Sequence, residues 1–167
     1  LMEQARAQAR MGVVDHMGGK DRVTDILQQE PLPPTKFVGY STTSVAHQQV
    51  SHAYCWLGDR YESVEKLSKG EYGALIVAET PCYAEAGGQV GDTGIISHPV
   101  AGTFKVEDTV RAGVTVFHLG VVINGEIHMV QPGSQCQKST VNLKVDRSRR
   151  LKIMANHTIT HMMNRAL

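Results

Sequence analysis

From about residue 36 onward, apolar and polar positions alternate, which is typical of half-buried β-strands. Short runs of β-branched and aromatic residues recur, and glycine, proline or asparagine turns separate them. Seven or eight such strands, with no helix between them, favour a closed or nearly closed antiparallel β-barrel over residues 35–145. Strand-like segments lie at residues 37–40, 42–57, 61–67, 72–80, 103–108, 115–123, 126–130 and 135–145, and apolar residues also lead out of the glycine-rich stretch described below.

One turn in this region carries a specific prediction. Asn124-Gly125 is a dipeptide that favours a type I′ turn, because both of its residues tolerate positive φ. It is therefore predicted to form a hairpin between the strands over 115–123 and 126–130.

Helical patterns flank the predicted barrel on its N-terminal side. Residues 2–17 combine alanine with glutamate, glutamine and arginine, which are strong helix formers, and Gly18-Gly19 ends the pattern. A weaker helical stretch over 21–29 leads to Pro31, Pro33 and Pro34, which cannot continue a helix. Residues 1–34 are therefore expected to be the end of a preceding helical domain together with a linker.

A second helix is expected after the barrel. Asp146 stands where an N-cap would, and residues 147–167 have helical periodicity. Because the chain begins at Leu1 in mid-pattern and ends at Leu167 without a C-cap, it is expected to be a piece of a longer protein. The helical apolar stripe consists of Leu151, Met154, Thr158 and Met162.

The stretch from Thr80 to Gly94 is the most distinctive segment of the barrel region. It reads Thr-Pro-Cys-Tyr-Ala-Glu-Ala-Gly-Gly-Gln-Val-Gly-Asp-Thr-Gly, and apolar residues precede and follow it. Glycines permit positive φ and a close approach of the backbone to another group. The pattern fits a barrel corner or bulge as well as a ligand-binding loop.

Composition narrows the possible functions. The net charge is +1 over 167 residues, so any contact with nucleic acid must depend on a local patch. Three separated cysteines argue against a disulfide framework, and no apolar run is long enough to span a membrane. The densest basic cluster, which could contact an RNA backbone or could simply be a solvated helix start, consists of Lys144, Arg147, Arg149, Arg150 and Lys152.

One pair of residues suggests a metal. His157 and His161 lie four positions apart, which places them on the same face of a helix, about one turn apart. Two imidazoles at this spacing can bind one Zn²⁺, although solvated helix histidines have the same spacing. The metalloprotease signature requires glutamate after the first histidine, and Thr158 stands there instead.

The glycine-rich stretch, followed by Asp146-Arg-Ser-Arg-Arg150 and His157-Thr-Ile-Thr-His161, strongly resembles alanyl-tRNA synthetase. Phe37-Val-Gly-Tyr40 and Val106-Glu-Asp-Thr109 resemble further landmarks of that family, and free-standing alanyl-tRNA editing proteins share the barrel and the histidine pair. The resemblance covers about residues 35–167. It implies a translation-protein-like barrel between a central helical domain and an α+β editing domain, of which 146–167 is the first helix.

The resemblance also implies a function, the hydrolytic editing of mischarged Ser- or Gly-tRNA by an ATP-dependent alanine–tRNA ligase. His157 and His161 would supply half of a zinc shell, and Thr160 would line the amino-acid pocket as a catalytic residue, unless its hydroxyl only bonds back to a helix carbonyl. Gln89 would contact the tRNA or brace its loop, and Asp92, also a candidate tRNA contact, is expected with Glu85 to brace the turn. The positions expected to contact the tRNA acceptor end are Gly87, Gly88, Gln89, Gly91, Asp92, Arg149 and Arg150.

The chain departs from the family pattern in places. Cys82 stands where the family usually has phenylalanine, and residues 162–164 read Met-Met-Asn where the family usually has Leu-Leu-His. The second pair of zinc ligands and the domain that uses ATP and Mg²⁺ are expected outside this segment. The segment alone is therefore expected to be inactive.

The expected partners are the acceptor end of tRNA(Ala) and the rest of the synthetase chain, without a membrane. The expected location is the cytoplasm, with a mitochondrion or another organelle as the alternative. Two further hypotheses are a free-standing editing or RNA-binding module and a zinc hydrolase unrelated to tRNA.

Overall fold

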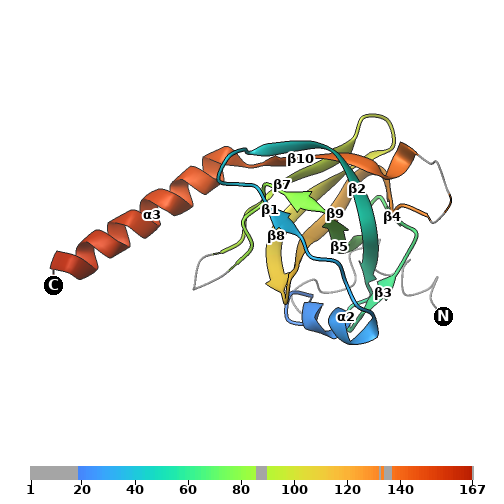
Figure 1. Cartoon of the computed structure of the whole chain (residues 1–167), viewed down its shortest axis with the longest axis horizontal. Helices are drawn as coiled ribbons and strands as arrows, with labels where there is room; N and C mark the ends of the chain where they lie inside the picture. The colour runs from blue at the N-terminus through green and yellow to red at the C-terminus, as the bar shows by residue number, and fades with distance from the viewer. Residues whose placement is uncertain (1–18, 86–89, 132, 134–136, 167) are drawn as a thin grey trace.

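The computed structural model describes residues 19–85, 90–131, 133 and 137–166 (Figure 1). The helix expected over 2–17 lies outside these ranges. Among the described residues, no helix is long and apolar enough to cross a membrane.

Six strands pair in a closed antiparallel ring, as the alternating pattern predicted. The order around the ring is β10, β7, β8, β9, β5 and β2, and the pairing of β10 with β2 closes it. The strands are β2 (Ser44–Trp56), β5 (Tyr72–Val77), β7 (Gly94–His98), β8 (Gly102–Ala112), β9 (Thr115–His128) and β10 (Thr140–Val145).

Four short strands lie outside the ring, and two of them form a sheet of their own. β3 (Tyr61–Ser63) pairs with β2, and β4 (Lys66–Ser68) pairs with the end of β9. The single strand expected over 61–67 is therefore two strands. β1 (Lys36–Phe37) pairs in parallel with β6 (Glu79–Thr80), just before the glycine-rich stretch.

Neighbouring residues of the central strands are buried on opposite faces of the sheet. In β2, Ala53 and Cys55 belong to the cluster inside the barrel, whereas Tyr54 and Trp56 belong to a second cluster on the outer face. The same alternation in β5 places Leu75 inside and Ile76 outside. These strands therefore need cover on both faces.

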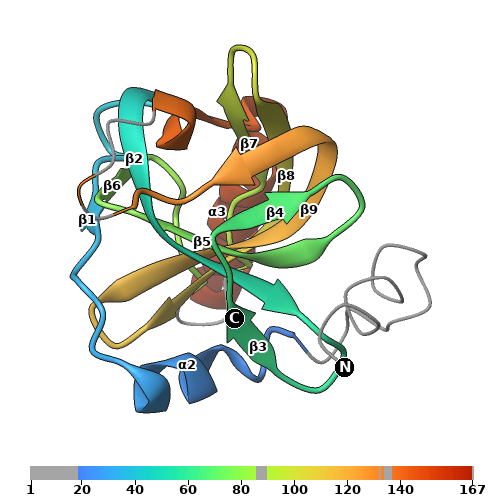
Figure 2. The same cartoon turned by 90° about the vertical axis from the view of Figure 1, so that its right-hand side faces the viewer.

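A short helix supplies the outer cover. Val23 and Ile26 of α2 (Val23–Gln29) are buried in the outer cluster, so the weak helical stretch over 21–29 is confirmed in shorter form. The linker that follows runs along the outside of the barrel to β1 (Figure 2). Thr35 fixes the linker to β9, because its N–H donates to the Val114 carbonyl at 2.9 Å and its hydroxyl accepts the Val116 N–H at 3.0 Å.

The hairpin predicted at Asn124-Gly125 is wrong, because β9 continues through both residues to His128. Gly125 does have positive φ, at 62°, but it lies opposite Gly102 in the ladder between β8 and β9. A Cβ atom at Gly125 would lie 2.0 Å from the Ala101 carbonyl oxygen. The glycine therefore permits a close crossing of strands, after which β9 pairs with β4.

One histidine is fully buried between the strands. His118 of β9 lies 3.0 Å through Nδ1 from the Leu75 carbonyl oxygen and 2.7 Å through Nε2 from the Thr80 hydroxyl. Because a carbonyl oxygen can only accept, Nδ1 carries the proton and Nε2 accepts from Thr80. Burial lowers the pKa of His118 from 6.5 to about 4, so the imidazole is neutral at pH 7.

The C-terminal helix leaves the barrel as a projecting arm (Figure 1). α3 (Arg147–Ala166) begins as predicted after Asp146, whose carboxylate accepts the Arg149 N–H at 3.1 Å. Its predicted apolar stripe is exposed, with Leu151, Met154 and Met162 each more than half accessible.

The buried His118 predicts a pH dependence of stability. Between pH 6.5 and about 4 the unfolded chain binds a proton at this position and the folded chain does not, so stability falls as the pH is lowered. The slope should reach about 1.4 kcal/mol per pH unit, with a total loss of about 3 kcal/mol. Urea unfolding from pH 7 to 4 measures it. His118→Gln should remove this part of the slope whatever its stability at pH 7, and an unchanged slope would contradict the assignment.

Candidate functional site

The two described ends of the glycine-rich stretch, at Tyr83 and at Asp92, are hydrogen-bonded to each other, and we call this junction the loop neck. The Tyr83 N–H donates to the Asp92 carboxylate at 2.7 Å, and the Asp92 N–H donates to the Tyr83 carbonyl at 2.9 Å. The Thr109 hydroxyl of β8 donates to the Asp92 carbonyl oxygen at 2.8 Å. The chain therefore leaves and re-enters the barrel wall at one point, and Asp92 braces this turn.

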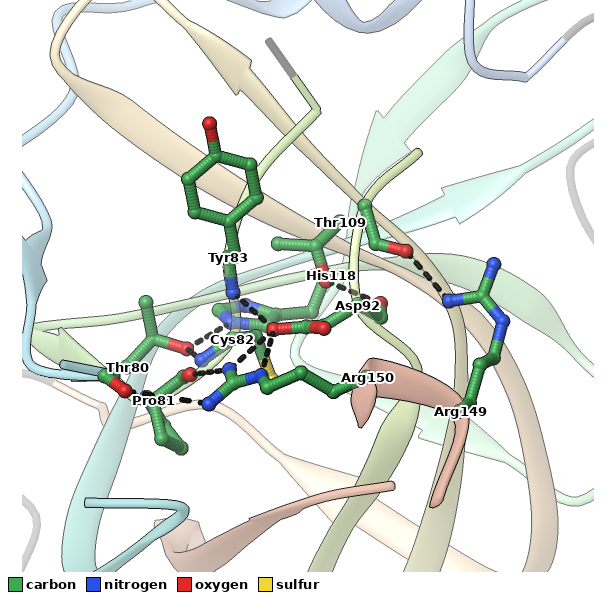
Figure 3. Close-up of polar contacts among 11 residues, drawn as sticks. Thr80, Pro81, Cys82, Tyr83, Asp92, Thr109, His118, Arg149 and Arg150 are labelled. Atoms are coloured by element: carbon green, nitrogen blue, oxygen red, sulfur yellow. Dashed lines mark hydrogen bonds and ion pairs between the residues drawn. The ribbon is translucent and has the colours of Figure 1, made fainter. Parts of the chain in front are cut away.

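Arg150 of α3 inserts its guanidinium group beside this neck (Figure 3). It pairs with the Asp92 carboxylate through both Nε, at 3.1 Å, and Nη2. Nη2 also donates to the Pro81 carbonyl at 2.5 Å, and Nη1 donates to the Gly39 carbonyl at 3.3 Å. Both charged side chains are largely buried, with exposed fractions of 15% and 7%. We call this set of contacts the Arg150 latch.

The neighbouring arginine adds a second contact with the loop. Arg149 Nη1 donates to the Gly91 carbonyl at 2.8 Å. Gly91 is close to the barrel wall, because a Cβ atom there would lie 2.2 Å from the Thr109 carbonyl oxygen. Positive side chains in the first turn of a helix oppose its dipole. Here both arginines turn back to contacts on the barrel, which accounts for their position.

A buried set of hydrogen bonds lies next to the Arg150 latch and connects His118, Thr80 and Cys82. Thr80 donates to His118 and accepts the Cys82 N–H at 3.1 Å (Figure 3). The Cys82 side chain is buried, and burial raises the pKa of its thiol to about 11. Cys82 is thus a packing residue and a poor nucleophile at neutral pH.

The loop is also held from the N-terminal side of the chain. The Lys20 ammonium pairs with the Glu85 carboxylate and lies 3.2 Å from an Asp108 carboxylate oxygen. Glu85, mainly through its hydrogen bond, raises the pKa of Lys20 above its usual value. The Glu85 N–H donates to the Thr109 carbonyl at 2.9 Å, so this residue also fixes the loop to β8.

The structure brings four of the predicted contact residues together, namely Gly91, Asp92, Arg149 and Arg150. Gly87, Gly88 and Gln89 lie outside the described residues. Thr160 is exposed on α3, and its hydroxyl donates to the Asn156 carbonyl at 3.0 Å, which is the helix contact named as the alternative for it.

The predicted metal ligands lie on the same helix as Thr160. The α3 backbone is helical through positions 157 and 161, whose side chains are outside the described part of the chain. Within that part, no group of three His, Cys, Asp or Glu residues is arranged to hold a metal ion.

A cleft of about 410 Å³ opens between the latch and α3. Phe37 packs edge-to-face on Tyr40, with ring centroids 5.0 Å apart, and on Tyr83, at 5.8 Å. In the sequence, Phe37 and Tyr40 were singled out only as family landmarks, and no local pattern connects them with Tyr83. Besides these rings, the lining includes Gly39, Val90, Asp92, Arg150, Ile153, Met154 and Thr158.

The Arg150 latch predicts a selective loss of stability. Arg150→Met leaves a buried carboxylate and two carbonyl oxygens without their donor, and should lower the free energy of unfolding by on the order of 2–4 kcal/mol. Arg147→Met, at an exposed position of the same helical turn, should change it by less than about 0.5 kcal/mol. Urea unfolding of both variants measures the difference, and equal effects would show that the latch does not hold the helix.

A family model and several curated relatives agree on the family to which this chain is similar. Residues 1–149 match the family model described as tRNA synthetases class II (A). The chain is 42% identical over 138 residues to the alanine–tRNA ligase of Roseiflexus sp. (strain RS-1), covering 81% of this chain and 14% of that protein. It is 36% identical over 167 residues to the alanine–tRNA ligase of Bradyrhizobium diazoefficiens, covering 99% of this chain and 17% of that protein.

A third relative, the alanine–tRNA ligase of Chloroflexus aurantiacus, is 36% identical over 168 residues, covering 99% of this chain and 17% of that protein. The chain thus spans about one-sixth of the length of these curated relatives. The glycine-rich stretch, the latch and the start of α3 all lie within or beside the matched region. The chain therefore belongs to the alanyl-tRNA synthetase family of the class II tRNA synthetases.

Proposed function

We propose that this chain forms one wall of a hydrolytic editing site in an alanine–tRNA ligase, where the ester of mischarged Ser- or Gly-tRNA is cleaved. The observation that carries the proposal is the Arg150 latch. It joins the neck of the glycine-rich loop to the first turn of the helix that bears positions 157 and 161. Two motifs about sixty residues apart in sequence are thereby fixed to each other.

The reaction is the attack of water on the ester carbonyl. A bond forms between the water oxygen and the acyl carbon, the bond to the ribose oxygen breaks, and the ribose oxygen receives a proton. The products are the free amino acid and a tRNA with a free terminal hydroxyl. Such a site must hold the acyl group, exclude bulk water and stabilise the oxyanion.

The residues of this chain would divide these tasks by position. His157 and His161 would hold a zinc ion together with ligands from other parts of the ligase, because a zinc site takes three or four protein ligands. A bound zinc ion would act as a Lewis acid or as an anchor for the amino group of the substrate. The backbone N–H groups of the loop suit phosphate or acyl oxygens.

Thr160 would contact the amino-acid side chain in this arrangement. Its hydroxyl donates to the Asn156 carbonyl and keeps its lone pairs available to accept from a serine hydroxyl. Because alanine has no hydroxyl to donate, this contact would favour serine over alanine. ATP and Mg²⁺ would serve aminoacylation in another domain, and the tRNA(Ala) acceptor end would be the shared partner.

The test uses a full-length ligase that carries this segment, with Ser-tRNA(Ala) as substrate. His157→Ala and His161→Ala should each lower the rate of deacylation by at least about 100-fold and reduce the zinc content, while alanine attachment to tRNA stays unchanged. Asn164→Ala, at an exposed position of the same helix, is the matched control and should keep both activities. The rate of deacylation is measured as the loss of radiolabelled Ser-tRNA(Ala) over time.

Three outcomes would contradict the proposal. One is full deacylation by both histidine variants, another is no deacylation by the unaltered ligase with zinc present, and the third is equal loss in Asn164→Ala.

A further inference from the structure

The cleft beside the Arg150 latch has an unusual composition for a surface hollow. Three aromatic rings line one side, and α3 lines the other through Met154 and Thr158. Its volume of about 410 Å³ lies within the range of small-molecule sites. Aromatic rings in such a lining offer faces on which a flat group can stack.

Tyr40 is the most exposed of the three rings. It is 91% accessible, and Phe37 contacts it edge-to-face with an interplanar angle of 77°. An edge-to-face contact uses one part of the Tyr40 ring and leaves the ring available for stacking. Tyr83, which packs on Phe37 from the loop neck, extends the aromatic wall toward the glycine-rich loop.

The charges that line the cleft balance, and the exposed charges on the adjoining turns of α3 include cations. The carboxylate in the lining, Asp92, is neutralised by Arg150 within the latch. Outside the lining, Arg147 and Lys152 are exposed in the first turns of α3, within three residues of Arg150, and Lys144 is exposed near the end of β10. A flat aromatic group next to cations suits a nucleobase with its phosphate, because bases stack on aromatic rings while phosphates pair with lysine and arginine.

We propose that this cleft binds a nucleobase at the single-stranded end of an RNA, stacked on Tyr40 and Tyr83. The inference rests on the proposed editing function, since it makes this base part of the tRNA acceptor end. Thr158 lines the cleft and is the direct neighbour of position 157 in α3. A base held here anchors the strand close to the helix that would carry the hydrolytic site.

The first test measures binding alone. The probe is a four-nucleotide RNA of sequence ACCA with 2-aminopurine at its 3′ end, whose fluorescence is quenched on stacking. Tyr40→Ala should weaken binding to the chain by about 5- to 100-fold, because one stacked base is lost. Tyr40→Phe should retain binding, and Val100→Ala, at an equally exposed site on another turn, should have no effect.

The second test uses the full-length ligase that carries this segment. Tyr40→Ala should raise the KM for Ser-tRNA deacylation with less effect on kcat, and alanine attachment to tRNA should not change. If His157→Ala abolishes deacylation but Tyr40→Ala changes neither KM nor probe binding, the cleft proposal fails and the editing function stands. If the unaltered ligase does not deacylate, the editing function fails, and the binding test still decides whether the cleft binds RNA.

Another segment of the ligase is the alternative occupant of the cleft. If such a segment fills the cleft, the probe should bind the isolated chain but not the full-length ligase. That outcome would overturn the proposal. Equal weakening by Tyr40→Ala and Tyr40→Phe would also overturn it, because stacking requires only the ring.

Discussion

The pairing of the Arg150 guanidinium with the neck of the glycine-rich loop is the contact on which the candidate site depends. A buried guanidinium carries five donors and a charge, and it is stable only where acceptors and a negative charge surround it. Asp92 supplies the charge, and the Gly39 and Pro81 carbonyls supply further acceptors. One side chain thus fixes the segment after β1, both ends of the loop and the start of α3.

The barrel behind this latch is stabilised on two sides. Its interior is closed by the ring of six strands, whereas the outer face of β2, β5 and β9 is covered by α2. Between these strands, the neutral His118 links the Leu75 carbonyl to Thr80, at the entrance of the glycine-rich stretch. The loop neck therefore rests on a buried, hydrogen-bonded base, which is what a preorganised site requires.

The sequence predicted the features that depend on local chemistry. The alternating pattern indicated the barrel, and Asp146 indicated the start of α3, because capping involves residues three positions apart. Asn124-Gly125 was misleading, since positive φ at Gly125 serves a close strand crossing as well as a turn.

The residues that Arg150 contacts could not be predicted from the sequence. Its acceptors lie 58 to 111 residues away, and two of them are backbone carbonyls, which every residue has. The aromatic cleft was hidden for the same reason, because Tyr83 joins Phe37 and Tyr40 only in the folded chain. Family resemblance, by contrast, singled out the loop and the helix before any contact between them was known.

The helix α3 projects from the barrel and is held at its first turn by the Arg150 latch, so a small tilt at that turn produces a larger displacement farther along the helix. Position 161 lies eleven residues beyond Arg150, about 16 Å along the axis at 1.5 Å per residue. A tilt of about 5° at the first turn would move that position by about 1.4 Å, more than the roughly 0.5 Å that a catalytic constellation tolerates. The accuracy with which the far part of the helix is placed therefore depends on how strongly its first turn resists tilting. The strength of any single bond farther along the helix matters less.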